Sequence, residues 1–371
     1  MKKKYFVSLF ILLLLFLSIS YISDQKFIHN KFYRSITKLI PLEIKKKIIN
    51  SKTVETYYTY LISKKTLNAF NLSKKDMVNK RKIFKEEFLL DESQVSITLN
   101  KKNKFKFLDF EYKPSAPLDI YSANYYEIEE YGILEYANVP KNKLLIYNQG
   151  HRGNPYNFKN FINIKNHYKK KGFDVLALSM PNLGFNKKVN FPGKDQNLGK
   201  HEIYHSFYDE KYKQKKPISV FVSGSYYLIK NLIERNDYEK IYYVGISGGG
   251  WMVTFLSSFI TDIDESYSFA SLIPLELKLL GVRGDWEASK AEFYKKIDYY
   301  DLFNLATLDK NFERKRKHYL VYNKDDDCCF SRPWSKIMKN VGENLGSQNF
   351  IIDELDINKH TIDLKYLFNK F

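Results

Sequence analysis

From about residue 95 to the end of the chain, short apolar runs alternate with longer segments of helical periodicity. Five runs have the length and the β-branched or aromatic content of buried strands: 143–148, 174–180, 240–246, 318–323 and 350–355. Further β-type runs come at 95–99, 107–112, 131–137 and 266–272, and helical segments at 157–172, 218–236 and from 249 onward. This alternation predicts an α/β fold with an open, mostly parallel sheet and helices on both faces. Ligands bind such a sheet at the carboxyl ends of its strands.

Residues 25–94 have a different pattern, rich in Lys, Tyr and Leu and without glycine. Apolar residues recur there at steps of three and four (Ile36, Leu39, Ile40, Ile44, Ile48), and Pro41 lies near a helix start. We therefore expect a helical stalk or packing arm over 25–94, and a separate domain over 95–371.

The first residues combine a basic start with a long apolar run. Three lysines at 2–4 precede an uncharged stretch from Tyr5 to Ile22, and no Ala-x-Ala follows it. A membrane span needs ~17–25 apolar residues, whereas the apolar part of a signal peptide has ~7–15. We expect residues 1–24 to be a single-pass membrane anchor and not a cleaved signal, although Ser18, Ser20 and Ser23 offer small residues for cleavage. Lysines lie on both sides of the run, and we expect the rest of the chain outside the cytoplasm.

Composition and charge exclude some partners. The 371 residues carry a formal net charge of +18, but the lysines are spread along the chain. Zinc-ligand spacing, RNA-binding aromatic motifs and basic heptad helices are missing, so we expect no nucleic-acid partner. The two cysteines, Cys328 and Cys329, are adjacent and cannot close a loop. A vicinal disulfide between them is allowed but strained, so they leave the redox compartment open.

One serine stands in a setting typical of a catalytic nucleophile. Gly245-Ile246-Ser247-Gly248-Gly249 fits G-x-S-x-G between a predicted strand and a predicted helix. A serine on such a turn takes strained backbone angles, so its neighbours must be small. The helix after it directs free N–H groups at the serine. A flexible glycine-rich loop is the alternative, but the strand and helix favour a nucleophile.

With this motif in this context, the chain resembles the α/β-hydrolase superfamily over residues 95–371. The resemblance implies the α/β-hydrolase fold and a triad in the order Ser, Asp or Glu, His. His360, in "NKHTID" after the run 350–355, is the candidate base. The alternatives fit less well: His29 lies in the arm, His167 on a charged helix, and His318 at the wrong end of a strand.

The acid is expected in the turn after the run 318–323. Asp325, Asp326 and Asp327 follow it, and a carboxylate there would hold the imidazole in the required tautomer. The family often has Gly-x-x-Asp after this strand, and Asn323 takes the place of that glycine. This spacing selects Asp326, with the register open by one residue, while the other two aspartates form a solvated turn.

The resemblance also implies an oxyanion hole of two backbone N–H groups. One is expected from Gly248 and the other from His151, in "QGHRGNP" after the run 143–148. The family commonly has His-Gly there, where this chain has Gln149-Gly150. We assign the ring of His151 no role in proton transfer.

Two further segments follow strand ends. Residues 180–207 form a long polar stretch that we expect to be a substrate-facing lid. His201 and His205 have i, i+4 spacing there, but no third ligand follows at a recognisable spacing, so no metal or other cofactor is predicted. Asp285, Trp286 and Glu287 either shape a pocket or cap the next helix, and capping is the simpler interpretation.

These features predict a membrane-anchored serine hydrolase that cleaves a small-molecule or glycan carboxylic ester. The triad would be Ser247, Asp326 and His360, and the reaction would pass through an acyl-enzyme. Serine chemistry on this fold leaves acyl transfer and amide or peptide cleavage open. A non-catalytic, membrane-tethered domain of hydrolase-like fold is the alternative from another class.

Overall fold

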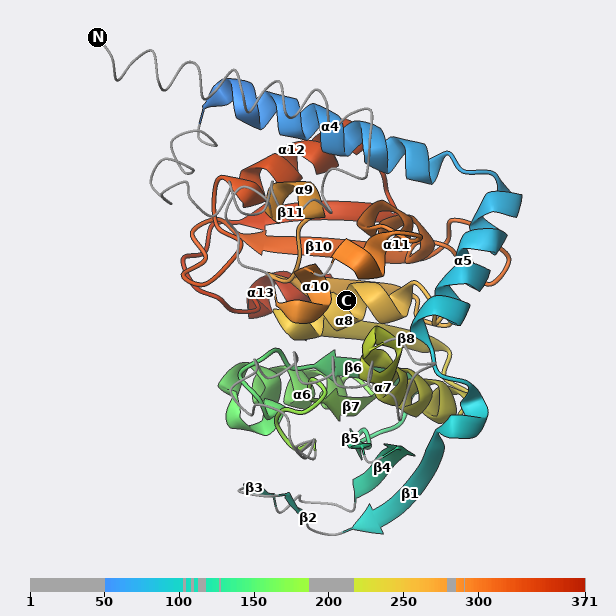
Figure 1. The fold of residues 1–371 in the computed structure, drawn as a ribbon. Helices are drawn as coiled ribbons and strands as arrows, with labels where there is room; N and C mark the ends of the chain where they lie inside the picture. Colours follow the sequence, from blue (N-terminus) through green and yellow to red (C-terminus); the bar gives the residue numbers. More distant parts are fainter. Residues whose placement is uncertain are drawn as a thin grey trace, which may run out of the picture.

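The computed structural model describes residues 51–102, 105–107, 110–112, 118–126, 128–186, 217–278, 285–289 and 291–370 (Figure 1). The expected membrane anchor, the first part of the arm with His29, and most of the expected lid with His201 and His205 lie outside these residues. Within the described ranges, none of the helices has both the length and the apolar character needed to cross a bilayer.

A nine-stranded sheet forms the centre of the molecule (Figure 1). Its strands are β1 (Ser96–Lys102), β4 (Leu118–Tyr125), β5 (Ile128–Glu135), β6 (Lys143–Asn148), β7 (Phe173–Leu178), β8 (Lys240–Ile246), β9 (Glu265–Phe269), β10 (Lys317–Asn323) and β11 (Phe350–Leu355). The order is β1-β4-β5-β7-β6-β8-β9-β10-β11. The pairs from β7 to β11 are parallel, whereas β1, β4 and β5 pair antiparallel at one side. Strands β2 (Phe105–Phe107) and β3 (Phe110–Tyr112) make a separate hairpin.

Helices cover both faces of this sheet. They are α4 (Lys52–Phe70), α5 (Lys74–Phe88), α6 (Lys159–Lys170), α7 (Pro217–Glu234), α8 (Gly248–Ser257), α9 (Leu275–Lys278), α10 (Trp286–Ser289), α11 (Tyr299–Leu305), α12 (Trp334–Leu345) and α13 (Leu364–Phe368). Short 3₁₀ turns are η2 (Glu92–Gln94), η3 (Pro155–Asn157) and η6 (Ala291–Tyr294).

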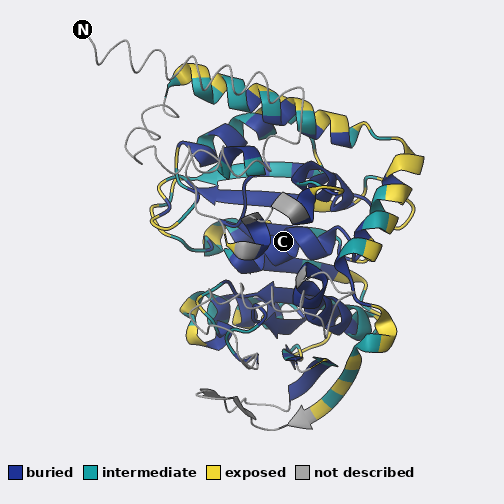
Figure 2. Cartoon of the chain, in the orientation of Figure 1, coloured by how far each residue is buried: buried dark blue, intermediate teal, exposed yellow. Residues whose placement is uncertain are grey.

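The alternation of side chains along each strand creates two separate cores. Leu144 and Ile146 of β6 enter the core shared with α7, α8, α11 and α12, whereas Leu145 and Tyr147 enter the core shared with α6 and α13. In Figure 2 the central strands and α8 are coloured as buried, whereas β1 at the edge is coloured exposed or intermediate. The predicted α/β class, with a mostly parallel sheet covered on both faces, is therefore confirmed.

The expected and observed strands agree best in the parallel part of the sheet. The runs 143–148, 240–246 and 350–355 coincide with β6, β8 and β11. Strand β4 was not predicted, because Asp119, Ser122 and Asn124 give it little β-propensity. Helix α7 forms despite Ser223, whose hydroxyl donates to the carbonyl of Ser219 at 2.7 Å and so completes its hydrogen bonding inside the helix.

The described part of the arm packs onto the domain and does not project from it as a free stalk. Helix α4 lies against α11 and α12, and α5 lies against α7 (Figure 1). The ring of Phe84 stacks on Phe259 with centroids 3.6 Å apart, and Phe88 contacts Phe255 edge-on. Figure 2 shows exposed residues along the outer surfaces of both helices. These aromatic side chains belong to the core that is shared with α7 and α8, and buried residues of α4 belong to the same core. Helices α4 and α5 are therefore structural parts of the domain.

Candidate active site

Ser247 lies on the turn between β8 and α8, in a backbone conformation that residues other than glycine rarely adopt. Its φ is 57° and its ψ is −129°, and its N–H donates to the carbonyl of Phe269 at 2.9 Å. A Cβ atom at Gly245 would lie 2.5 Å from the carbonyl oxygen of Gly249, and one at Gly249 would lie 2.1 Å from that of Asn148. Both glycines are therefore required by close backbone approach. Strain of this kind, ~1–3 kcal/mol, persists where the surroundings enforce it, and it clusters at functional sites.

His360 and Asp326 form a buried hydrogen-bonded pair. The Nδ1 atom of His360 lies 2.9 Å from Oδ2 and 3.1 Å from Oδ1 of Asp326. The Oδ1 atom also accepts hydrogen bonds from the backbone N–H groups of Cys328, at 2.8 Å, and Cys329, at 3.0 Å. Burial alone would raise the pKa of Asp326, but the hydrogen bond and charge of His360 and these two N–H donors outweigh it and lower the pKa.

Two neighbouring side chains hold the backbone on which His360 stands. The Oδ1 atom of Asp327 accepts a hydrogen bond from the N–H of His360 at 2.7 Å. The Nδ2 atom of Asn323 donates to the carbonyl oxygens of Lys359, at 2.7 Å, and Thr361, at 2.8 Å. Asn323 thus fixes the residues on both sides of the imidazole. Sequence reasoning used it only to set the register, although its place at the family's glycine position was the available signal.

The three candidate aspartates have three different environments. Asp326 faces the imidazole, Asp327 holds the backbone of His360, and Asp325 is exposed. Asp325 and Asp327 are both exposed, as expected of a solvated turn, but the carboxylate of Asp327 also bonds a residue 33 positions away in the chain.

Ser247 and His360 line the same cavity, whose volume is about 370 Å³. The Nε2 atom of His360 is buried and has no hydrogen-bond partner among the residues that the structure describes. His360 and Ser247 are therefore not hydrogen-bonded to each other in this state. Catalytic hydrogen bonds are often long without substrate and shorten when it binds. The cavity also includes Tyr147, Gln149, Gly150, His151, Arg152, Phe158 and the two cysteines.

On the other side of Ser247, the ring of His151 lies against Gly248. A Cβ atom at Gly248 would be 2.3 Å from Cε1 of His151. Gly248 is the first residue of α8, and the N–H groups of a first helical turn have no partner within the helix. The loop after β6 and the start of α8 therefore meet beside the serine, where the two expected N–H donors would have to lie.

The segment around α10 contacts His151. The Oε1 atom of Glu287, which is fully buried, lies 3.1 Å from Nε2 of His151, and Asp285 lies 3.6 Å from Nδ1. Of the three residues expected to shape a pocket or cap the next helix, Asp285 lines the cavity of Ser247, whereas Glu287 does not line it and contacts His151. Close by, burial lowers the pKa of Lys278 to about 7, although the charges of Glu287 and Asp285 act in the opposite direction. The sequence carried no signal for these long-range contacts.

The other described histidines lie in structural settings. His318 is fully buried and bonds the hydroxyls of Ser266 at 2.7 Å and Thr254 at 3.2 Å. Burial, assisted by the charge of Arg316, lowers the pKa of His318 to about 3, so the ring stays neutral. His167 stacks on Phe368 with centroids 3.8 Å apart. Neither ring lines the cavity of Ser247.

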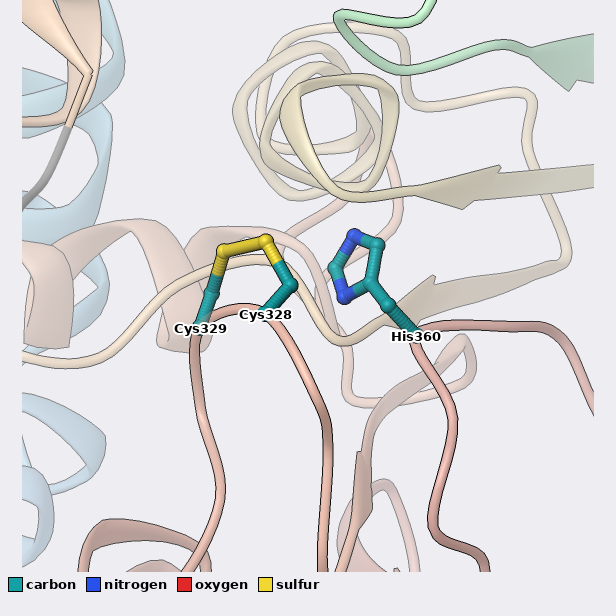
Figure 3. Close-up of side chains that lie close together, drawn as sticks. All are labelled: Cys328, Cys329 and His360. Carbon is teal, nitrogen blue, oxygen red and sulfur yellow. A yellow bond between two sulfur atoms is a disulfide. The ribbon is translucent and has the colours of Figure 1, made fainter.

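Cys328 and Cys329 form a disulfide in the wall of this cavity, next to His360 (Figure 3). Within the described ranges, two clusters each bring the potential metal-ligand atoms of three side chains within 4.8 Å of one another. One consists of Cys328, Cys329 and His360, and the other of His151, Asp285 and Glu287. Sequence spacing could not reveal either cluster, because each joins residues that are distant in the chain.

The fold is similar to that of solved structures of esterases. Acetyl xylan esterase 1 from Thermoanaerobacterium sp. JW/SL YS485 superimposes with a TM-score of 0.51 at 14% identity, covering 80% of this chain and 91% of that chain. The acetyl xylan esterase from Paenibacillus sp. R4 has a TM-score of 0.45 at 12% identity, covering 81% and 93%. Est1E from Butyrivibrio proteoclasticus has a TM-score of 0.42 at 14% identity, covering 68% and 95%.

The sequence itself matches no protein-family model, and no curated protein is similar to it at a significant level. At such low identities the structural similarity concerns the fold. Together with the strand order and the turn at Ser247, it establishes that the chain has the α/β-hydrolase fold.

Proposed function

We propose that the protein is a serine hydrolase that cleaves a carboxylic ester through an acyl-enzyme. The observation that carries this proposal is that the strained Ser247 and His360, whose imidazole is paired with the buried Asp326, line one cavity. A binding domain without catalysis has no use for a buried carboxylate–imidazole pair whose outer nitrogen is unpartnered among the described residues. That pair favours the enzyme over the tethered binding domain.

The reaction follows from the positions of these groups. Ser247 attacks the ester carbonyl while Nε2 of His360 takes its proton, and Asp326 stabilises the imidazolium through Nδ1. The negative oxygen is stabilised by the N–H groups of Gly248 and His151. His360 then gives its proton to the departing alcohol and activates a water molecule, which releases the acyl group from Ser247.

The size of the cavity favours a small ester. About 370 Å³ is near the lower end of the ~300–1,000 Å³ typical of ligand pockets. The structural neighbours named acetyl xylan esterases are consistent with a small-molecule or glycan ester, and acyl transfer or amide cleavage on the same triad stays an alternative. The test is a series of p-nitrophenyl esters, with acetate and butyrate expected to be turned over faster than palmitate. Hydrolysis of amides but of no ester in the series would contradict the proposal.

Asn323 is expected to act on catalysis by positioning His360. Asn323→Asp replaces the donor of two hydrogen bonds by an oxygen that repels both carbonyls, and it should lower kcat by ~10–10² with little change in KM. Steady-state kinetics measures this. Asn358→Asp makes the same change at an exposed position of the loop that carries His360, and it serves as the control. Equal activity of both variants would show that the position of His360 does not depend on Asn323.

We further propose that the run 5–22 anchors the protein in a membrane, with the hydrolase domain outside the cytoplasm. The support is the length of the apolar run. The full chain should stay with membranes after carbonate extraction, and protease added to intact cells should cleave the domain.

A chain that starts at residue 25 should be soluble and active. One that starts at residue 95 should not fold, because it lacks Phe84 and Phe88 of the core. If the protein expressed from the full sequence is recovered with a new amino terminus near Ser20 or Ser23, the run is instead a cleaved signal.

A further inference from the structure

The wall of the cavity beside His360 is made by two sulfur atoms. Cys328, which is exposed, and Cys329, which is half-buried, form a disulfide there (Figure 3). Both sulfur atoms and a ring nitrogen of His360 lie within 4.8 Å of one another. The side chain of His360 is only 7% exposed. Its Nε2 atom has no hydrogen-bond partner among the described residues. Two sulfurs and the imidazole of His360, whose Nε2 atom is unsatisfied among the described residues, thus lie close together.

We propose that reduction of this disulfide creates a binding site for a soft divalent cation such as Zn²⁺, and that the bound ion inhibits the enzyme. The ligands are the Sγ atoms of Cys328 and Cys329 and the Nε2 atom of His360. Thiolate and imidazole ligands select Zn²⁺ over Mg²⁺ and Ca²⁺, which prefer oxygen. Inhibition rests on the proposed function, because the ion would occupy the lone pair with which His360 accepts the proton of Ser247.

The distances suit this ion after a small movement. Tetrahedral Zn²⁺, with bonds of ~2.3 Å to sulfur and ~2.0–2.1 Å to nitrogen, holds two thiolates ~3.8 Å apart and each thiolate ~3.6 Å from the nitrogen. The two sulfur atoms and a ring nitrogen of His360 already lie within 4.8 Å of one another. Because the two sulfurs are bonded to each other, both side chains point to the same side of the backbone. Reduction moves the sulfurs apart, in the direction that two thiolates on one ion require.

A second arrangement typical of zinc sites is already present. Histidines that bind zinc commonly donate their other N–H to a carboxylate, which fixes the tautomer and raises the basicity of the ligating nitrogen. Asp326 accepts from Nδ1 of His360 at 2.9 Å, so the Nε2 lone pair is the one left for a ligand. The same carboxylate accepts hydrogen bonds from the backbone N–H groups of both cysteines. It therefore holds the backbone of the two cysteines close to the imidazole.

The chemistry balances with an external dithiol as the reductant. The dithiol transfers two electrons and two protons to the disulfide, giving two cysteine thiols and the oxidised dithiol. Zn²⁺ then displaces the two thiol protons and binds the neutral imidazole, which keeps its proton on Nδ1. Because binding releases protons, affinity should rise with pH. The fourth position of the tetrahedron stays open to water or another small ligand.

The test compares oxidised and dithiol-reduced full-length protein after anaerobic removal of the reductant. Equilibrium dialysis should find one Zn²⁺ per chain in the reduced protein, with little in the oxidised protein. Co²⁺ in place of Zn²⁺ should give a thiolate charge-transfer band in the reduced protein. Zn²⁺ should inhibit ester turnover only after reduction, and Mg²⁺ should not inhibit in either state.

Variants separate the three ligands and the two levels of the proposal. The double variant Cys328→Ser/Cys329→Ser should lose both Zn²⁺ binding and the charge-transfer band. His360→Ala should weaken binding by at least the ~10–100-fold that loss of an outer-shell partner costs. Ser247→Ala should bind Zn²⁺ like the unaltered chain, because the serine is not a ligand. This inactive variant tests the site independently of the proposed hydrolysis.

The outcomes are decisive in both directions. Equal Zn²⁺ binding by the oxidised and reduced protein would overturn the proposal, and so would undiminished binding by the double serine variant or by His360→Ala. Because the first comparison uses the unaltered chain, a folding defect in a variant does not remove the test. If reduced protein binds Zn²⁺ through these residues but no ester is hydrolysed, the site stands and the proposed function fails.

Discussion

Replacement of Ser247 by alanine is expected to lower ester turnover by ~10⁴-fold or more, since the members of a triad act as a unit. The change removes only the Oγ atom from a residue that lines the cavity with His360. The backbone turn at Ser247 should persist, because Gly245 and Gly249 still allow the close approach around it. Steady-state kinetics of the purified variant, with its circular dichroism spectrum as a check on folding, measures the effect.

Ser247→Gly is the matched control for this variant. It should be equally inactive, yet melt at a higher temperature than Ser247→Ala, because glycine adopts a φ of 57° without the contacts of a Cβ atom. Release of ~1–3 kcal/mol of strain, less the ~0.4–1 kcal/mol that glycine costs through the unfolded chain, leaves a net gain of about 1 kcal/mol. Full turnover by either variant would remove Ser247 from the mechanism. A glycine variant that is less stable than the alanine variant would contradict the strain.

The second large effect is expected for Asp326→Asn. The asparagine Oδ1 can still accept the N–H groups of Cys328 and Cys329, so its Nδ2 would face Nδ1 of His360. That donor favours the histidine tautomer with the proton on Nε2, which cannot accept the serine proton. A loss of ~10⁴ in kcat is the scale known for this defect in serine proteases.

The neighbouring aspartates supply isosteric controls. Asp325→Asn alters an exposed carboxylate and should leave turnover nearly unchanged. Asp327→Asn keeps an oxygen for the N–H of His360, so its effect should be small. In contrast, Asp327→Ala should have a larger effect, because it removes that acceptor. A series in which Asp325→Asn or Asp327→Asn is the inactive variant would assign the acid to that residue and contradict the geometry described here.

The fold could be predicted where one local pattern dominates. Strands β6 and β8 are buried within the parallel part of the sheet, so their apolar runs are visible in the sequence. Strand β4 is different, because its polar side chains are satisfied by partners elsewhere in the fold. The hydroxyl of Tyr136, for example, donates to Asp119. Tyr136 lies directly after β5, 17 positions from Asp119, so the sequence of β4 alone does not contain this partner.

The candidate site likewise has parts that the sequence predicts and parts that it does not. The setting of Ser247 is local, since strand, turn and helix are contiguous, and the spacing from Asn323 led to the aspartate that faces His360. The roles of Asn323 and Asp327 were not predicted, because each bonds a backbone loop more than 30 residues away. The contact of Glu287 with His151 spans 136 residues and depends on the packing of α10 over the cavity.

The central claim, that Ser247 is the nucleophile, is tested most directly by covalent labelling. The intact protein is treated with a fluorophosphonate, digested, and analysed by peptide mass spectrometry. The account predicts one adduct per chain, on the peptide that contains Ser247, and none in Ser247→Ala. An adduct on another residue, or labelling that persists in Ser247→Ala, would contradict it.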